Sequence, residues 1–418
     1  MDSNREGFEG AGRERERLTP AVDWRRNLVA LWFAEFTAIF GFSFAFPFLS
    51  IFISQDLGVH PGRDLDLWTA AAGSVSGLAM AVASPIWGVL GDRLGRKPML
   101  IRSMLGGAIT VGLIFFVQTP IQLVVLRFLQ GATSGTVAAA TALVAVETPR
   151  NRVGWALGVV TSAVALGSAV GPVVGGIAGA FFGLRLVFLG GGILLLISMI
   201  PVLLVVRESP LKARDASRPG TLAMIRQRPG ALRSLAMLIG AQSLITVVNT
   251  ATQQLIVLRL IEMLGRAASS LTGIAFGAAG LTNSVSAIGY TAVTRRIGYV
   301  RMLTLASVLL AVTIGTLVVA PNAVWVVLAV GVAGLLYGAF VPATASMIGL
   351  ETPIEAQSTV FGFNASGVAF GFFLGPLIGG GIAATSDVRV ALAVTAALAL
   401  GLAFLVLLGT REPRIERP

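Results

Sequence analysis

Two stretches of this chain, GVVTSAVALGSAVGPVVGG at 158–176 and GFNASGVAFGFFLGPLIGG at 362–380, carry the same spacing of glycine and proline. The second copy follows the first by 204 residues at every position of the pattern. An ETP triplet precedes each copy, at 147–149 and at 351–353. A match of this length indicates an internal duplication, so we expect two related halves. The positions that we single out are Gly158, Gly167, Gly171, Pro172, Gly175, Gly176, Gly371, Gly375 and Pro376.

A more degenerate repeat lies nearer the N-terminus, at an offset of 203 residues. It matches Gly77 with Gly280 and Asp92 with Arg295, so the acid occurs only in the first copy. The duplication therefore extends beyond the glycine pattern.

The composition excludes a soluble globular protein. Of 418 residues, 55% are hydrophobic and only 12% are charged, and the mean hydropathy is +0.84. Soluble domains contain about 25% charged residues, so most of this surface is expected to face lipid. The net charge of +11 comes from basic residues in short segments between apolar runs. That pattern is typical of cytoplasmic loops, and we expect no nucleic-acid partner.

The residue inventory excludes several kinds of chemistry. The chain has no cysteine, and its single histidine, His60, lies in a polar loop. Disulfides, thiolate or histidine-rich metal sites and Ser-His-Asp catalysis therefore lack the residues they need. We expect no metal, no cofactor and no enzymatic activity.

Apolar runs long enough to cross a bilayer recur along the whole chain, since a membrane-spanning helix needs about 20 largely apolar residues. The candidate spans are 27–52, 66–90, 98–118, 121–146, 154–182, 184–206, 234–261, 269–293, 299–320, 322–349, 356–384 and 388–409. These runs predict an all-α membrane protein with 12 transmembrane helices in two pseudo-symmetric six-helix bundles. A duplication of this kind places a transport site between the halves.

The distribution of Lys and Arg between the spans predicts the orientation. The long connection 207–233 is rich in bases, whereas the connection 53–67 holds mainly acids. Both termini are therefore expected in the cytoplasm, with the protein in the plasma membrane. The expected division is an N-terminal tail (1–26), an N-terminal bundle (27–206), a linker (207–233), a C-terminal bundle (234–410) and a C-terminal tail (411–418).

The stretch GVLGDRLGRKP at 88–98 places one acid and three bases between glycines. A phosphate-binding loop has four residues between its glycines and continues with Lys and then Ser or Thr. Here only three residues separate Gly91 from Gly95, and proline follows Lys97, so nucleotide binding is not expected.

The stretch 88–98 resembles instead the loop between helices 2 and 3 of the major facilitator superfamily. RFLQGATSG at 127–135 is similar to the family's helix-4 motif, and the glycine pattern at 158–176 resembles the helix-5 motif of its drug:proton antiporters. The stretch ETPRNRVGWALG at 147–158 looks most like multidrug efflux proteins of the MdtG kind. The resemblance covers about 27–410 and implies the twelve-helix fold of that family.

The resemblance implies that the loop 88–98 acts as a gate. Its residues are Gly88, Asp92, Arg93, Gly95, Arg96 and Lys97. Asp92 would meet the start of helix 11 when the transporter faces outward, because unpaired N–H groups there favour a carboxylate. The bases would pair across the two halves with Glu351 or Glu355. The alternative is a basic loop that serves only topology.

The glycine pattern at 171–176 flattens one face of helix 5, and small residues let helix backbones approach. We expect helix 8, with Gly273 and Gly277, as its partner, and helix 2 as the partner of the second copy. The near-complete copy on helix 11 argues against a mechanism that gives helix 5 alone a special role. The alternative is close packing without any role in coupling.

Glu35 is the only acid well inside a predicted span, about 12 Å along helix 1 at 1.5 Å per residue. A carboxyl in a span usually marks a pathway or proton relay, and burial favours its protonated form. Arg127 in helix 4 keeps its charge, and the resemblance places it in the same proton-handling network. The alternatives are a carboxyl that meets a base or water, and an arginine bonded to backbone carbonyls.

Uncharged amides in spans suit a cavity wall or interhelical hydrogen bonds. The residues that we assign to the substrate cavity are Phe36, Gln130, Asn249, Gln253 and Asn364. We expect a monomeric, proton-coupled antiporter that exports hydrophobic or amphipathic drugs by alternating access, with substrate, protons and lipid as partners. A transporter of a polar metabolite (a sugar, peptide or siderophore) and a non-transporting receptor or assembly factor are the alternatives.

Overall fold

The computed structural model describes residues 23–149, 152–209, 231–352, 357–410 and 412. Within them the chain is all-helical, and twelve helical segments are long and apolar enough to cross a membrane. The fold class predicted from the sequence is confirmed. The tails at 1–22 and 413–418, most of the linker, and Glu355 lie outside the described residues.

The first six spans form the N-terminal bundle. Its elements are α2 (Trp24–Ala45), η1 (Phe46–Phe48), α3 (Leu49–Gln55), α4 (Arg63–Leu94), α5 (Arg96–Leu113), η2 (Ile114–Phe116), α6 (Pro120–Thr133), α7 (Thr136–Glu147), α8 (Val153–Phe182) and α9 (Leu184–Leu204). The Asp23 carboxylate accepts hydrogen bonds from the first backbone N–H groups of α2, which explains why this helix begins there. Thr119 and Gln122 form a capping box at the start of α6.

The remaining six spans form the C-terminal bundle. Its elements are α11 (Ala231–Leu264), η3 (Gly265–Ala267), α12 (Ala268–Ile297), α13 (Tyr299–Val318), α14 (Ala323–Glu351), α15 (Gln357–Thr385) and α16 (Val388–Gly409). The side chains of Asn322 and Asp387 cap α14 and α16. The two bundles thus each contain six spans in the order that the sequence predicted.

The fourth span is broken, although the sequence predicted one continuous helix over 121–146. The break lies at Ser134 and Gly135, between α6 and α7. Gly135 has a φ of 126°, a backbone conformation that glycine adopts without steric cost. The glycine that closes the helix-4 motif is therefore the point at which the helix changes direction.

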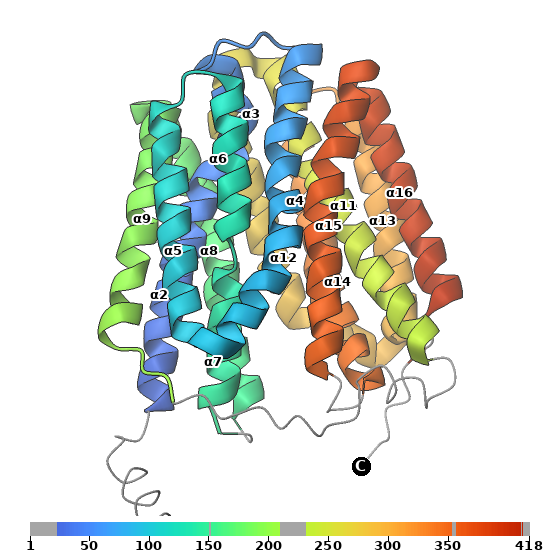
Figure 1. Cartoon of the computed structure of the whole chain (residues 1–418). Helices are drawn as coiled ribbons and strands as arrows, with labels where there is room; N and C mark the ends of the chain where they lie inside the picture. The colour runs from blue at the N-terminus through green and yellow to red at the C-terminus, as the bar shows by residue number, and fades with distance from the viewer. Residues whose placement is uncertain (1–22, 150–151, 210–230, 353–356, 411, 413–418) are drawn as a thin grey trace, which may run out of the picture.

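The described chain begins and ends at the same end of the molecule (Figure 1). We call this end, which carries Asp23 and Glu412, the proximal end, and the opposite end the distal end. The loops that join α3 to α4 and α13 to α14 lie at the distal end.

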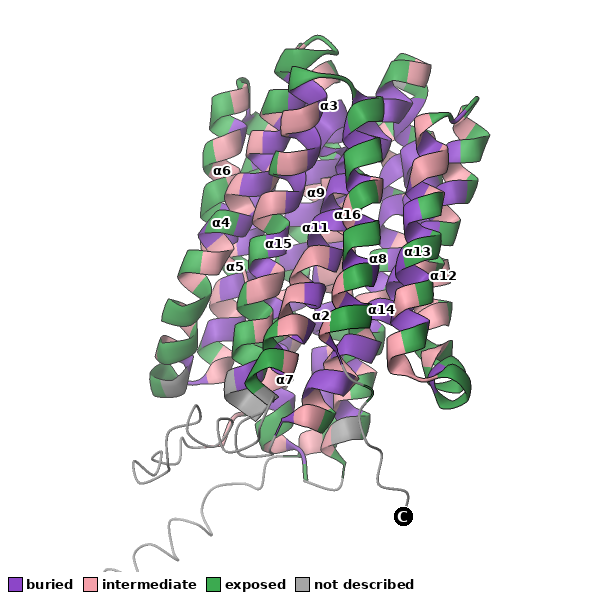
Figure 2. Cartoon of the chain, turned by 90° about the vertical axis from the view of Figure 1, so that its right-hand side faces the viewer, coloured by how far each residue is buried: buried purple, intermediate pink, exposed green. Residues whose placement is uncertain are grey.

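The outer surfaces of the helices are apolar. Exposed residues cover the outside of α16, whereas buried residues line the interior of the bundles (Figure 2). Large apolar side chains such as Phe181, Leu204 and Leu408 are among the most exposed. An apolar surface of this extent fits contact with lipid, so the chain is an integral membrane protein.

The two bundles meet in their distal halves through small residues. Gly77 of α4 lies against the backbone of Phe372 and Phe373 of α15, where a Cβ atom would stand only 2.5 Å from the carbonyl carbon of Phe372. On the other side of the molecule, a Cβ atom on Gly176 of α8 would stand 3.0 Å from the Cα atom of Gly273 of α12. Backbones approach this closely only where side chains are absent.

Glycines on the proximal halves of the same helices lie in open space. Eleven residues make about three helical turns, so positions eleven apart share a face. Gly88 lies eleven residues after Gly77 on α4, and both Gly88 and Gly362 of α15 have open space where a Cβ atom would stand. Ile288, on the proximal half of α12, is 81% exposed. The bundles therefore diverge toward the proximal end, as α4 and α15 do in Figure 1.

We expect Gly77→Val to shift the protein out of this distally closed state, because the added methyl groups would overlap the backbone of α15. The substitution Ile288→Cys introduces a single cysteine, and its rate of labelling by a water-soluble maleimide reports the shift. We expect a several-fold slower rate in Gly77→Val and an unchanged rate in Gly88→Val, which has free space on the same helix. Equal rates in all three proteins would contradict the assigned contact.

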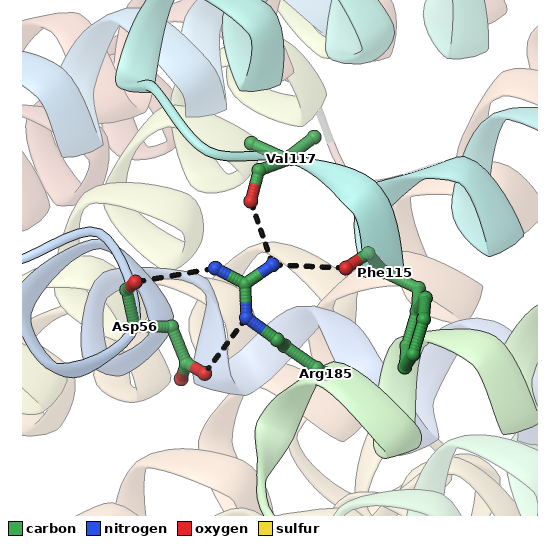
Figure 3. A network of polar contacts seen from close by, with 4 residues as sticks. All are labelled: Asp56, Phe115, Val117 and Arg185. Carbon is green, nitrogen blue, oxygen red and sulfur yellow. Dashed lines mark hydrogen bonds and ion pairs between the residues drawn. The ribbon is translucent and has the colours of Figure 1, made fainter.

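Arg185 fastens three elements together at the distal end of the N-terminal bundle (Figure 3). Its Nη1 donates to the carbonyl oxygens of Phe115 (2.9 Å) and Val117 (2.7 Å), which end the third span. Its Nη2 donates to the carbonyl oxygen of Asp56 at 3.3 Å, and its Nε lies 3.4 Å from the Asp56 carboxylate. One guanidinium at the start of α9 thus satisfies carbonyls at the ends of α3 and η2.

Burial raises the pKa of Asp56 above its ordinary value, and the nearby Arg185 guanidinium opposes this with a smaller effect. A folded-state pKa above the unfolded value means that the stability linked to this group is lost as pH rises through the folded pKa. The carboxylate charge is therefore not what makes this network stable.

We accordingly expect Asp56→Asn to change the free energy of unfolding at pH 7 by less than about 1 kcal/mol. Arg185→Ala should lower it by about 2–3 kcal/mol, because it leaves three main-chain carbonyls without their donor. Thermal unfolding in detergent measures both. The part of the pH dependence that Asp56 causes should also disappear in Asp56→Asn. An Asp56→Asn protein as unstable as Arg185→Ala would show that the ion pair dominates.

Candidate functional site

Glu35 lies inside the N-terminal bundle with its side chain fully buried. Neither carboxyl oxygen has a hydrogen-bond partner among the described residues. Glu35 is eleven residues after Trp24, about 16 Å along α2. A buried carboxyl without donors is costly as an anion, so this environment favours the protonated form.

The face of α2 that carries Glu35 points toward the other helices of its own bundle. Phe42 and Phe46, seven and eleven residues further along, share this face. The Phe42 ring approaches Gly107 of α5, and the Phe46 ring lies 4.5 Å from the guanidinium of Arg127 of α6. Glu35 therefore faces the interior of the bundle and not lipid.

Arg127 is half-buried and bonded to the neighbouring helix α4. Its Nε donates to the carbonyl oxygen of Ala72 at 2.9 Å, and its Nη2 donates to the Ser76 hydroxyl at 2.7 Å. Its Nη1 donates to the side chain of Gln130. All three nitrogens of the guanidinium are thus occupied within the bundle.

The structure does not bring Arg127 and Glu35 together. Arg127 lies at the depth of Phe46, the first residue of η1, which is about 16 Å further along the first span than Glu35. One of its bonds goes to a backbone carbonyl, as the structural alternative expected, and the other two go to the side chains of Gln130 and Ser76. Arg127 lies closer to the distal interface than to Glu35. Its partners Ala72 and Ser76 directly precede the contact residues Gly73 and Gly77 on α4.

The remaining helix-4 motif residues serve the same contact. Gly131 lies directly against the carbonyl of Ser76, where no Cβ atom would fit. Gln130 is buried and accepts the bond from Arg127. The motif RFLQGATSG therefore clamps α6 to α4, and Gln130 belongs to this clamp, although we assigned it to the cavity from the sequence.

We expect Arg127→Lys to lower the free energy of unfolding by about 1–3 kcal/mol, because a single ammonium group cannot reproduce three bonds in a fork. Thermal unfolding in detergent measures the loss. Arg93→Lys, at an exposed position of the same bundle, is the matched control and should stay within about 0.5 kcal/mol. Equal stability of the two variants would show that the Arg127 bonds contribute nothing.

The gate residues form a capped helix start at the proximal end. Gly95 has a φ of 101°, and the Glu208 carboxylate accepts hydrogen bonds from the backbone N–H groups of Arg96 (2.7 Å) and Lys97 (2.9 Å). The Lys97 ammonium donates to the carbonyl oxygen of Val206 at 2.7 Å. These contacts stabilise the positive end of α5 within its own bundle.

The C-terminal bundle repeats this arrangement. Gly298 has a φ of 85°, and the Glu412 carboxylate accepts hydrogen bonds from the N–H groups of Tyr299 (2.6 Å) and Val300 (2.9 Å). Glu208 and Glu412 are 204 residues apart. The duplication therefore includes the two carboxylates, which our sequence analysis missed because they follow the last span of each half.

The predicted pairing of the loop 88–98 with acids of the other bundle concerns the proximally closed state, which is not the state of this structure. Among the described residues, Lys97 bonds to its own bundle and not to Glu351. Arg93 is exposed. The side chain of Asp92 lies outside the described residues. A bundle arrangement that diverges at the proximal end leaves these groups separated, so the cross-bundle pairing stays a prediction for the proximally closed state.

The repeated glycine pattern serves two helix faces at once. Gly167, Gly171 and Gly175 lie against the backbone of α2, so this row packs within its own bundle. Pro172 and Gly176 lie against Gly273 of α12, as the sequence predicted for the other bundle. The first row was not anticipated.

The second copy follows the same rule. Gly371 and Gly375 pack on Thr246 and Thr250 of α11, and Pro376 packs on Gly73 of α4. Gly158, at the proximal end of the first copy, has free space around it. Each copy thus fixes α8 or α15 to its own bundle on one face and to the other bundle on the next.

The residues assigned to the cavity lie in different surroundings. Phe36 stacks with Trp32 and Phe40 at ring-centroid distances of 5.6 and 6.0 Å in an aromatic row along α2. Gln253 is exposed on the otherwise largely buried α11, and its Nε2 donates to Asn249 Oδ1 at 2.9 Å.

Asn364 of α15 is half-buried, and its Oδ1 has no hydrogen-bond partner among the described residues. Together with Gln253, it offers hydrogen-bonding groups that no described contact uses fully. The structure thus leaves amide groups free on helices of the C-terminal bundle and aromatic rings on α2 of the N-terminal bundle.

Two six-helix bundles related by an internal repeat, in contact at one end and diverging at the other, define a membrane transporter of the alternating-access type. The sequence profile of the Major Facilitator Superfamily matches residues 31–295 and 244–418. The chain belongs to this superfamily.

Similar proteins carry the name multidrug resistance protein MdtG. The MdtG protein of Dickeya zeae is 31% identical over 94% of this chain and 97% of its own length. That of Proteus mirabilis is 31% identical over 90% of this chain and 93% of its own. The resemblance to MdtG-like proteins that the sequence motifs indicated is therefore confirmed over nearly the whole chain.

Solved structures of low identity share the fold. An auto-inhibited peptide transporter of the POT family superposes with a TM-score of 0.76 at 16% identity, covering 94% of this chain and 99% of that one. The nucleoside transporter NupG superposes with a TM-score of 0.72 at 15% identity, covering 91% and 98%. These likenesses support the fold alone.

Proposed function

We propose that this protein exports hydrophobic or amphipathic compounds by alternating access, in exchange for protons. The relatives named for multidrug resistance support the substrate class, because they match this chain along nearly its whole length. The observation that carries the proton coupling is Glu35, a fully buried carboxyl to which no described residue donates a hydrogen bond.

The relative free energies of the neutral and ionised forms of Glu35 depend strongly on what surrounds the carboxyl. In this closed environment the neutral form is favoured, whereas water or a cationic drug at the same face would favour the anion. A ligand shifts the equilibrium between states only by its difference in affinity for them. Competition between proton and substrate at Glu35 supplies such a difference.

The orientation follows from the charge of the loops. The proximal end carries the basic loop 88–98 and the bases near 295–301, so we place it in the cytoplasm of a plasma membrane. The present state would then be open to the cytoplasm. We further propose a monomer with bundles at 27–206 and 234–410, joined by the linker 207–233. Phe36, Asn249, Gln253 and Asn364 remain our candidates for substrate contact.

The proposal is tested by proton release in proteoliposomes with a pH-sensitive dye and a panel of lipophilic drugs. We expect drug-evoked proton release in the parent protein and its loss to background in Glu35→Gln, while drug binding persists. Glu147→Gln is the matched control, since this carboxylate accepts bonds from Ser209 and plays no part in the proposed exchange. Release that survives Glu35→Gln would remove Glu35 from the mechanism, and a response to sugars or peptides alone would contradict the substrate class.

A further inference from the structure

A second buried acid lies at the distal interface. Asp66 is in the first turn of α4 and is 6% exposed. The described side chains give its carboxylate no hydrogen bond. The sequence analysis counted Asp66 among the acids of the connection 53–67 and set the start of the second span at residue 66, so it predicted no burial for this carboxyl. The structure begins α4 at Arg63, and Asp66 is buried where its main-chain oxygen lies beside Gly380 of the C-terminal bundle.

The charges that face Asp66 from the other bundle are also negative. Glu262, near the end of α11, and Asp387, which caps α16, are the charged side chains of the C-terminal bundle that act on Asp66. Arg259 of the same helix donates a hydrogen bond of 2.9 Å to the Glu262 carboxylate and pairs with it, while the carboxylate keeps its negative charge. The Asp387 carboxylate caps its own helix, α16, by accepting a hydrogen bond from the backbone N–H of Arg389.

The other elements packed on this part of α4 supply no compensating cation among the described side chains. The distal end of α15, at 377–386, contains no charged residue. Asp56, beyond α3, is paired with Arg185. Arg63 and Asp64 in the same turn of α4 are exposed. Closing the bundles thus brings the Asp66 anion against like charge.

An unsatisfied donor points at the same place. Gln254 of α11 is 9% exposed, and its Nε2 has no hydrogen-bond partner among the described residues. A Cβ atom on Gly380 of α15 would touch this Nε2 and would stand 2.9 Å from the main-chain oxygen of Asp66. The Gln254 amide therefore lies beside the first turn of α4, across the interface.

We propose that Asp66 is a second proton-binding site and that its proton holds the two bundles together at the distal end. This proposal rests on the export function proposed above and adds to it the step that closes the distal mouth. With the bundles apart, Asp66 is solvated and ionised. A proton taken up from the distal solution neutralises it, and the neutral carboxyl tolerates burial beside Glu262, Asp387 and Gln254.

The proposal fixes the sign of the pH dependence. Low pH favours the distally closed state, because that state binds one more proton at Asp66. For a single linked proton, the ratio of closed to open protein falls by at most about tenfold for each unit rise in pH. An acidic distal solution would therefore drive the protein toward the state seen here.

The absence of cysteine in the chain allows a direct measurement. Spin labels at Gln118→Cys and Pro321→Cys occupy exposed positions on distal loops of the two bundles. Pulsed electron resonance then gives the distance across the distal mouth without any drug. We expect the closed fraction to fall between about pH 5 and about pH 9 in the parent protein and to stay high throughout in Asp66→Asn.

Asp64→Asn is the matched control, because it removes the same charge from an exposed position in the same turn, and it should keep the parent profile. Asp387→Asn retains the helix cap, since asparagine caps as well, and should weaken the pH dependence by removing one like charge. This second variant tests the proposal without altering α4.

Three outcomes would overturn the inference. They are a parent profile that does not change with pH, an Asp66→Asn profile equal to the parent, and loss of the profile in Glu35→Gln but not in Asp66→Asn. Because no drug is present, none of these outcomes bears on drug export. Conversely, failure of drug-evoked proton release would leave a pH-dependent distal distance intact.

Discussion

The contact of bare backbones at the distal interface is the constraint on which this structure depends. In lipid, the hydrophobic effect does not drive helices together, so association relies on close van der Waals packing. The contacts of Gly77 with the backbone of α15 and of Gly176 with Gly273 provide that packing without interlocking side chains. Contacts of this kind are short-ranged and can be lost over a small rotation. They suit an interface that must open, whereas a core of interlocked large side chains would not.

Each bundle, in contrast, is held together by directional bonds. Arg127 joins α6 to α4, Arg185 joins the distal ends of α3, η2 and α9, and Glu208 caps α5 at the proximal end. Main-chain carbonyls and N–H groups buried in a membrane must find partners, which makes these bonds costly to break. Rigid bundles with a weakly bonded interface are what a rocking motion requires. The glycine pattern unites both roles, since one row fixes α8 to α2 while the next row meets the other bundle.

The sequence predicted the fold because two strong signals agreed. Apolar runs gave the twelve spans, and the 204-residue repeat gave the two bundles. It also predicted the contact of the Gly-Pro segment with Gly273. It did not predict the break at Gly135, because a glycine within a span is compatible with a continuous helix and only the φ of 126° distinguishes the two. It missed Glu208 and Asp66 for a related reason: both lie at the ends of spans, where burial depends on tertiary packing and not on local hydropathy.

The positions of the two buried acids relative to the interface decide what each can do. Rocking of rigid bundles changes the surroundings of a residue only where it faces the other bundle or the space between them. Asp66 lies at the interface with the opposite bundle, where Glu262 and Asp387 are the nearby charged groups, so opening of the distal mouth would change its electrostatic environment directly. Glu35 lies on a face of α2 directed into its own bundle. Its surroundings change only if water or substrate reaches that face from the proximal opening. In the two proposals made here the acids therefore have separate roles, Asp66 responding to closure of the distal mouth and Glu35 to what enters from the proximal side.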